Sequence, residues 1–177
     1  MADSIEKQLK SLIKPKTKLS NGKTIAEYLK EAVDCLYQCL QDEIDFYYDS
    51  YEPTMYERTY ALRKSFRAED IVDIRVKGKS FYLSVVSTPD AWQWNLPAVV
   101  DPVTYRTYKL KRHKTFAPAM VARGWDSVGL ASLVGNIYYL TWFEGYDFIS
   151  EAIDEFNKKN KWGVNVYIEK NITNYIK

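Results

Sequence analysis

Residues 24–48 read TIAEYLKEAVDCLYQCLQDEIDFYY, and this stretch decides the fold of the chain. Its apolar side chains recur every three or four residues, which predicts one long amphipathic helix. Thr24 and Glu27 have the spacing of a capping box, in which the threonine hydroxyl accepts the third helical N–H and the glutamate returns to the threonine N–H. A helix of this kind buries its apolar stripe against other elements, so the rest of the fold is expected to pack on it.

Weaker patterns on the C-terminal side predict the partners of this helix. They include a β-hairpin around Gly78, whose strands are rich in β-branched and aromatic residues, and a second amphipathic helix that starts at Tyr146 or Asp147. The fold class expected is α+β, with a small antiparallel sheet packed against the long N-terminal helix and a second C-terminal helix. The expected elements are a helical turn at 58–66, strands at 71–76, 81–87 and 163–169, and a helix at 146–159.

The length of 177 residues favours a single domain. Residues 1–23 are interpreted as an N-terminal helical arm and linker, in which a helix over 3–14 ends at Pro15. Residues 24–177 form the α+β domain. Within it, 88–135 is a long irregular insertion that holds four of the six prolines and three of the five tryptophans.

Composition limits the classes of function. The chain is 46% hydrophobic with a formal charge of +2, a balance too mild to indicate a nucleic-acid or membrane role by itself. No apolar run reaches the ~20 residues of a membrane span, and the first residues lack the apolar core of a secretory signal. We therefore expect a soluble intracellular protein without a membrane partner, with Cys35 and Cys39 reduced on one helix face.

No sequence motif for catalysis is present. There is no phosphate-binding glycine loop, no zinc-protease or nucleophile-elbow motif and no paired CxxC, and the chain holds one histidine, His113. The many carboxylates fall mostly opposite the apolar stripes, where solvated side chains belong. We predict no enzyme, no catalytic residues, no cofactor and no metal site; a hydrolase with a metal site built from scattered carboxylates remains a third alternative.

The aromatic content is high, with 15 Tyr, 7 Phe and 5 Trp. Tyr and Trp suit protein–protein interfaces because they bury a large area and keep one polar tip. The interface candidates are the insertion residues Trp92, Trp94 and Trp125. In the alternative interpretation these tryptophans fold back and close the domain's own core.

The segment 105–114 combines basic and aromatic side chains and is a candidate for contact with nucleic acid or an acidic surface. Its alternative interpretation is an exposed loop or edge strand whose basic residues discourage unwanted pairing. The candidate residues are Arg106, Lys109, Lys111, Arg112 and Lys114.

Two stretches carry a family resemblance. Residues 56–66 resemble the pattern Tyr-x-Arg-Thr-x-x-Leu-x-x-Ser that opens the core of minor tail, or tail-completion, proteins of tailed bacteriophages; the usual glycine after the threonine is Tyr60 here. Residues 143–157 resemble the late Phe-Glu-Gly segment of that family, where a strand end runs into a helix. The matching positions are Tyr56, Arg58, Thr59, Leu62, Ser65, Phe143, Glu144 and Gly145.

The resemblance implies a structural virion protein that forms a ring at the head–tail neck or tail end. Its partners would be further copies of itself, the neighbouring connector and tail proteins, and double-stranded DNA in the lumen. It would be assembled in the cytoplasm of the host bacterium, and its motif residues would be structural. The alternative is a phage accessory protein that binds nucleic acid or a host factor through 105–114.

Overall fold

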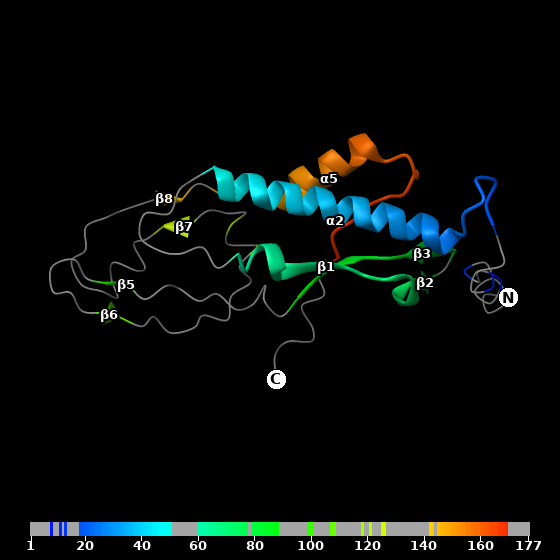
Figure 1. Cartoon of the computed structure of the whole chain (residues 1–177), viewed down its shortest axis with the longest axis horizontal. Coiled ribbons are helices and arrows are strands. Elements are labelled where there is room, and N and C mark those ends of the chain that lie inside the picture. The colour runs from blue at the N-terminus through cyan, green and yellow to red at the C-terminus, as the bar shows by residue number, and fades with distance from the viewer. Residues whose placement is uncertain are drawn as a thin grey trace.

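A computed structural model gives the fold of the chain. It describes residues 18–50, 60–77, 79–88 and 145–169, four short strands, and the single positions Gln8, Ser11, Ile13, Pro118 and Val121. Figure 1 shows a long helix, α2, with a second helix, α5, along one side and an extended hairpin along another. The predicted α+β class is confirmed.

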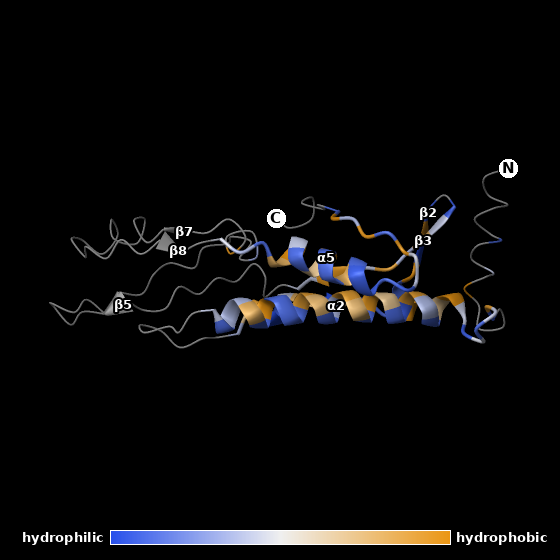
Figure 2. Ribbon diagram, turned by 90° about the horizontal axis from the view of Figure 1, so that it is seen from above, coloured by the Kyte–Doolittle hydropathy of each residue, from blue (hydrophilic) through white to orange (hydrophobic). Residues whose placement is uncertain are grey.

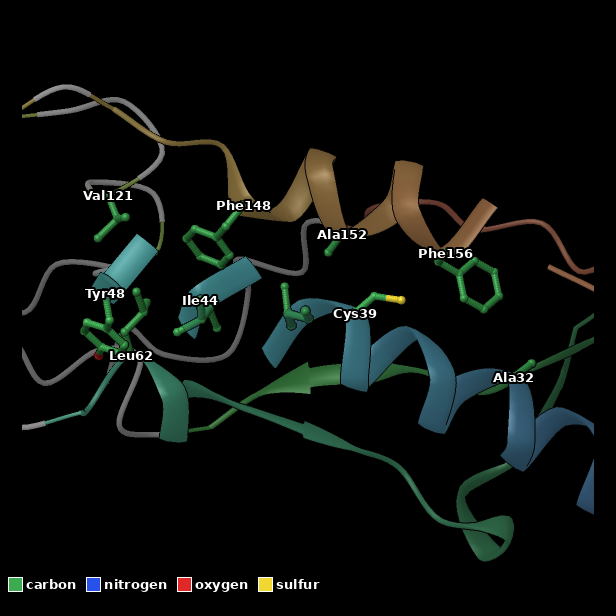
Figure 3. Packing of buried hydrophobic residues seen from close by; sticks show 10 residues of the cluster. Ala32, Cys39, Ile44, Tyr48, Leu62, Val121, Phe148, Ala152 and Phe156 are labelled. Carbon is green, nitrogen blue, oxygen red and sulfur yellow. The ribbon is translucent and has the colours of Figure 1, made fainter. Parts of the chain in front are cut away.

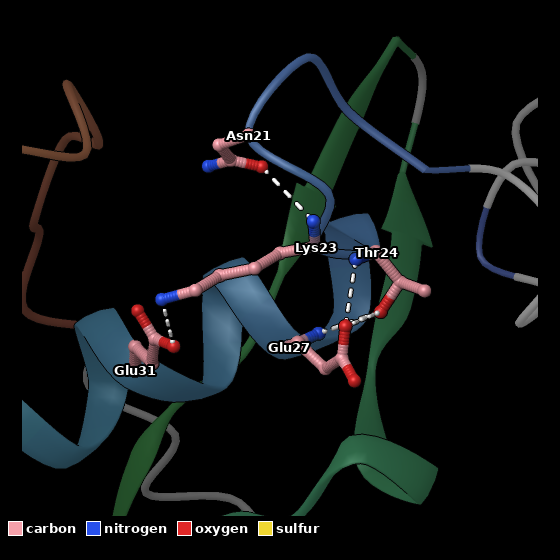
Figure 4. Close-up of polar contacts among 5 residues, drawn as sticks. All are labelled: Asn21, Lys23, Thr24, Glu27 and Glu31. Atoms are coloured by element: carbon pink, nitrogen blue, oxygen red, sulfur yellow. Dashed lines mark hydrogen bonds and ion pairs between the residues drawn. The ribbon is translucent and has the colours of Figure 1, made fainter.

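Helix α2 (Ile25–Asp49) begins at the predicted capping box (Figure 4). The Thr24 backbone N–H donates to Glu27 Oε2 over 2.7 Å, and the Glu27 N–H donates to Thr24 Oγ1 over 3.1 Å. These two bonds satisfy amides that have no partner inside the helix. The helix ends at Asp49, where the Ser50 N–H donates to the Phe46 carbonyl oxygen.

Helix α5 (Phe148–Lys159) starts two residues after the first expected position, with Asp147 as its N-cap. The Ser150 N–H donates to Asp147 Oδ1 over 3.3 Å. Buried residues recur every fourth position, and Figures 1 and 2 show α5 alongside α2, running in the opposite direction. The buried positions are Phe148, Ala152 and Phe156.

The apolar stripes of both helices form one buried core (Figure 3). Ile44 of α2 and Phe148 of α5 have no exposed surface. Full burial of an aliphatic or aromatic side chain contributes about 1.5–3 kcal/mol, so these few residues dominate the stability of the helix pair. Leu62 and Val121 join the same cluster from outside α2 and α5.

The strands β1 (Phe66–Ala68), β2 (Arg75–Lys77), β3 (Ser80–Tyr82) and β4 (Val85–Ser87) form one interrupted hairpin. β2 pairs with β3 next to the turn, and β1 pairs with β4 at the open end; both pairs are antiparallel. Between the pairs, residues 69–74 lie opposite only Leu83 and Ser84, so the first strand bulges into the short 3-10 helix η2 (Ile71–Asp73). The predicted hairpin is thus confirmed.

Two details of the predicted hairpin are wrong. The strand 71–76 begins only at Arg75, because Asp70 caps η2 by accepting the Ile71 N–H over 2.7 Å. The strand 81–87 is interrupted because Glu69 takes over the backbone of Ser84: its N–H donates to the Ser84 carbonyl, and its carboxylate accepts the Ser84 N–H.

The predicted helical turn at 58–66 is also corrected. In the described residues it is reduced to the 3-10 helix η1 (Arg63–Ser65), and β1 follows at once. Phe66, the last residue of the predicted turn, adopts extended backbone and pairs with Ser87, so it belongs to a strand.

The predicted final strand, 163–169, has no ladder partner and is not a strand. Val164 and Val166 do pack on the core, as the alternating pattern indicates. Asn160, however, binds the backbone of Val164 at both its N–H and its carbonyl, with distances of 3.4 and 2.7 Å, and so occupies groups that a ladder would need. Ile168 stays 59% exposed, so the alternation ends before the segment does.

The insertion 88–135 contains short strands and contributes to the core. β5 (Val99–Val100) pairs with β6 (Thr107–Tyr108), and β7 (Trp125–Asp126) pairs with β8 (Trp142–Phe143). Pro118 and Val121 are buried. The segment is therefore not wholly a surface decoration. Of the predicted N-terminal helix 3–14, Gln8 and Ser11 are described in a helix and Ile13 in a turn, and the other residues lie outside the described residues.

Phe148→Ala should cost about 3–5 kcal/mol of unfolding free energy, because it removes a fully buried ring between α2 and the hairpin. Phe46→Ala is the matched control, since Phe46 is 60% exposed on α2, and it should cost under about 1 kcal/mol. Urea denaturation measures both. Equal losses would mean that the helix pair is not packed as described.

Thr24→Ala should lower the free energy of unfolding, measured by urea denaturation, by about 1 kcal/mol through loss of the cap.

The pKa of Glu27 is lowered, first by the hydrogen bond from the Thr24 N–H and then by that from the Thr24 hydroxyl. A lowered carboxyl pKa stabilises the fold above the ordinary glutamate pKa of about 4.3, and this contribution is lost as the pH falls through the lowered value. Glu27→Gln should retain the cap and flatten the acid limb of a stability–pH profile; an unchanged limb would contradict this assignment.

Candidate functional site

The first motif segment, described from Tyr60 to Phe66, lies under the C-terminal half of α2. Leu62 is buried in the core cluster, and Ser65 is fully buried. The Ser65 hydroxyl donates to the Ala61 carbonyl over 2.9 Å, and the Ser65 carbonyl accepts the Thr88 N–H over 2.8 Å. Ser65 therefore links the open end of the hairpin, at Thr88, to the segment that precedes β1.

Tyr60 has a left-handed backbone, with φ at +52°. It is the one described non-glycine residue with positive φ. This region is strained for a side chain with a Cβ and open to glycine. The ring of Tyr60 contacts Tyr48 of α2 at a centroid distance of 5.2 Å, edge to face. Packing on α2 thus offsets part of the backbone strain.

A polar clamp fixes the same segment to α2. Buried Gln41 donates from Nε2 to the Arg63 carbonyl over 3.2 Å and accepts from Arg63 Nε over 3.3 Å. The Arg63 guanidinium also forms an ion pair with Asp45 over 3.0 Å. These contacts set the position of η1 along the helix.

The second motif segment runs from β8 into α5. Its Tyr146 donates its N–H to the Val121 carbonyl over 3.0 Å and its hydroxyl to Glu43 of α2. Burial raises the pKa of the Tyr146 hydroxyl well above its usual range, and the hydrogen bond to Glu43 raises it further. Tyr146 therefore remains a neutral donor and anchors the start of α5 to α2.

The two motif segments meet at the C-terminal end of α2. The rings of Phe66 and Phe148 lie edge to face with centroids 6.2 Å apart. Figure 3 shows Leu62, Tyr48, Ile44 and Phe148 gathered at this end of the core. We call this region the motif junction: Leu62, Ser65 and Phe66 from one segment, and Phe148 from the other.

An aromatic group borders the motif junction and was not predicted from sequence. Tyr146 stacks on Tyr47 with centroids 6.3 Å apart and contacts Phe46 at 5.5 Å. Phe46 and Tyr60 expose 60% and 47% of their surface. Three consecutive aromatic residues, Phe46-Tyr47-Tyr48, could have indicated this group from the sequence. Helical periodicity alone indicates only that the apolar stripe ends there.

The motif junction holds packing groups and lacks the pairing of a nucleophile with a base. Burial raises the pKa of the Cys39 thiol to about 11, so at neutral pH this sulfur is a protonated packing group. Cys35 and Cys39 are both free, as expected. Within the described residues, no three His, Cys, Asp or Glu side chains are grouped to hold a metal ion. None of the helices in the described ranges is both long and apolar enough to span a bilayer.

Most candidate residues from the sequence lie outside the described residues. Trp125 and Phe143 are described only in their backbones, where they pair across β7 and β8, and Gly145 is half-buried. The predicted interface and basic-segment roles therefore stay predictions. The positions outside the described residues are Trp92, Trp94, Arg106, Lys109, Lys111, Arg112, Lys114, Tyr56, Arg58, Thr59 and Glu144.

Comparisons of the chain with protein-family models, with curated proteins and with solved structures found no match.

Tyr60→Gly should be more stable than Tyr60→Ala by about 1 kcal/mol, because both lose the ring contact with Tyr48 but only glycine relieves the left-handed strain. At most positions an alanine variant is instead more stable than the glycine variant. Chemical denaturation of both variants measures the difference. A more stable alanine variant would show that Tyr60 does not adopt this backbone in solution.

Proposed function

We propose that the protein is a structural component of a tailed bacteriophage, forming a ring at the head–tail neck or tail end. This is the role implied by the resemblance of 56–66 and 143–157 to tail-completion proteins. The contacts of the described motif residues support a structural role for them: Leu62 and Ser65 are buried, and Ser65 bonds only to backbone groups in the contacts described.

The backbone of Tyr60 is the observation that carries this proposal. The phage pattern has a glycine at this position, and the chain has a tyrosine whose φ of +52° lies in the region that favours glycine. Tyr60 therefore adopts the backbone of a glycine without being one. This is the result expected if the chain inherited a turn with glycine at this position and the glycine was later replaced by tyrosine. The Tyr48 ring contact gives a physical reason why the substitution is tolerated.

The meeting of the two motif segments is a second support. They are far apart in the chain, yet Phe66 and Phe148 touch, and β8 runs into α5 as the family pattern expects at its Phe-Glu-Gly segment. A shared packing role explains why both segments would be retained together. The exposed aromatics beside them, Phe46 and Tyr60, are suited to contact a neighbouring protein.

Within the basic segment 105–114 the described residues are Thr107 and Tyr108, which form β6 against β5. Pairing with a neighbouring strand is compatible with the edge-strand interpretation of this segment. The nucleic-acid or host-factor alternative gains no specific support from the described residues.

The test is deletion of the gene from the phage or prophage that carries it. A neck or tail-completion ring is needed to join heads to tails, so the deletion should leave heads and tails unjoined in electron micrographs, and wild-type protein supplied in trans should restore infectious particles. The Tyr60→Gly variant, which preserves the motif junction, is the matched control and should also restore them. Normal joined particles from the deletion strain would refute the proposal.

A further inference from the structure

The face of α2 that points away from the core is acidic. The helix carries seven carboxylates and one lysine, and its exposed positions follow one line along the helix with spacings of three and four residues. We call the line at Asp34, Gln38, Asp42, Phe46 and Asp49 the acidic stripe. Asp34 pairs with Lys30. Asp42 accepts a hydrogen bond from Gln38 and lies within electrostatic reach of Lys159, but neither Asp42 nor Asp49 forms an ion pair with a described residue.

The outer face of the hairpin has the opposite charge. Residues 60–88 carry six basic side chains and three carboxylates. Along β1 and β2 the exposed positions alternate with half-buried ones, so Arg67 and Lys77 point outward. Arg63 and Arg75 have ion-pair partners within the chain. The remaining four, which we call the basic face, have none among the described residues: Lys64, Arg67, Lys77 and Lys79.

These two surfaces lie on different sides of the subunit. Helix α2 packs against α5 and the hairpin through its buried positions, and Figure 1 shows these two partners along different sides of α2. The acidic stripe is on the remaining side. The basic face consists of exposed residues of η1, of strands β1 and β2, and of the hairpin turn. One molecule therefore presents an acidic surface on α2 and a basic surface on η1 and the hairpin.

We propose that the acidic stripe of one copy docks on the basic face of the next copy, and this inference rests on the proposed ring. Contacts between two different patches are heterologous, which is the type of interface that closes into rings. A symmetric dimer through either patch alone would bring like charges together and is therefore disfavoured. Phe46, at the edge of the stripe, supplies apolar area to the same contact.

Two double variants test the pairing. Asp42→Lys with Asp49→Lys makes both surfaces basic, and Arg67→Glu with Lys77→Glu makes both acidic. All four side chains are exposed, so circular dichroism should show unchanged folding. The matched control is Glu151→Lys with Asp154→Lys, which reverses two exposed carboxylates of α5 outside both surfaces.

Each preparation is a mixture of unlabelled and nitrogen-15-labelled protein at its highest soluble concentration and low salt. A carbodiimide then joins carboxylates to contacting amines, and mass spectrometry identifies links between chains. Wild type and the α5 control should give intermolecular links from Asp42 or Asp49 to Lys64 or Lys79. Arg67→Glu with Lys77→Glu keeps all four of these reactive groups and should lose the links about tenfold or more, since like charges then face each other. Mixing the two double variants should restore association, measured by sedimentation velocity.

The inference is overturned if wild type gives no links between α2 and the hairpin, or if the mixture associates no better than each variant alone. If the basic-face variant instead loses binding to a double-stranded DNA fragment, and no such links form, the hairpin is a nucleic-acid surface. Either result leaves the deletion test of the virion role unaffected, because a virion protein can assemble through other surfaces.

Discussion

Burial of the apolar stripe of α2 is the constraint on which the other described elements depend. The stripe is wider than one partner can cover, so α5 packs on one part and the hairpin and η1 on another. Neither partner is long enough to be stable by itself in water: α5 is 12 residues long, and each strand of the hairpin has three. The helix α5 and the hairpin are therefore stabilised by packing on the apolar stripe of α2.

The packing of α2 also positions the motif junction, which carries the resemblance behind the proposed function. Ser65, Leu62 and Phe148 are placed by the C-terminal end of α2, and Gln41 and Glu43 of the same helix hold Arg63 and Tyr146. Two of the residues that carry the phage resemblance, Leu62 and Ser65, are thus buried packing residues of this chain. Their burial leaves the outer surfaces, including the acidic stripe and the basic face, available for neighbours.

The sequence predicted the elements whose signals are local and periodic. Helix α2, its capping box and α5 were foreseen because apolar spacing and cap chemistry act within a few residues. The strand limits were not, because Asp70, Glu69 and Asn160 bind nearby backbone groups that a strand ladder would use. Burial of Pro118 and Val121 had no periodic signal, and the left-handed Tyr60 depends on a ring contact with distant Tyr48.

Cryo-electron microscopy of the particle that carries the gene tests the central claim most directly. The proposed virion role predicts density at the head–tail neck or tail end, repeated around the axis, into which the antiparallel α2–α5 pair and the interrupted hairpin fit as one unit. A particle whose neck and tail-end density is fully accounted for by other proteins would contradict it.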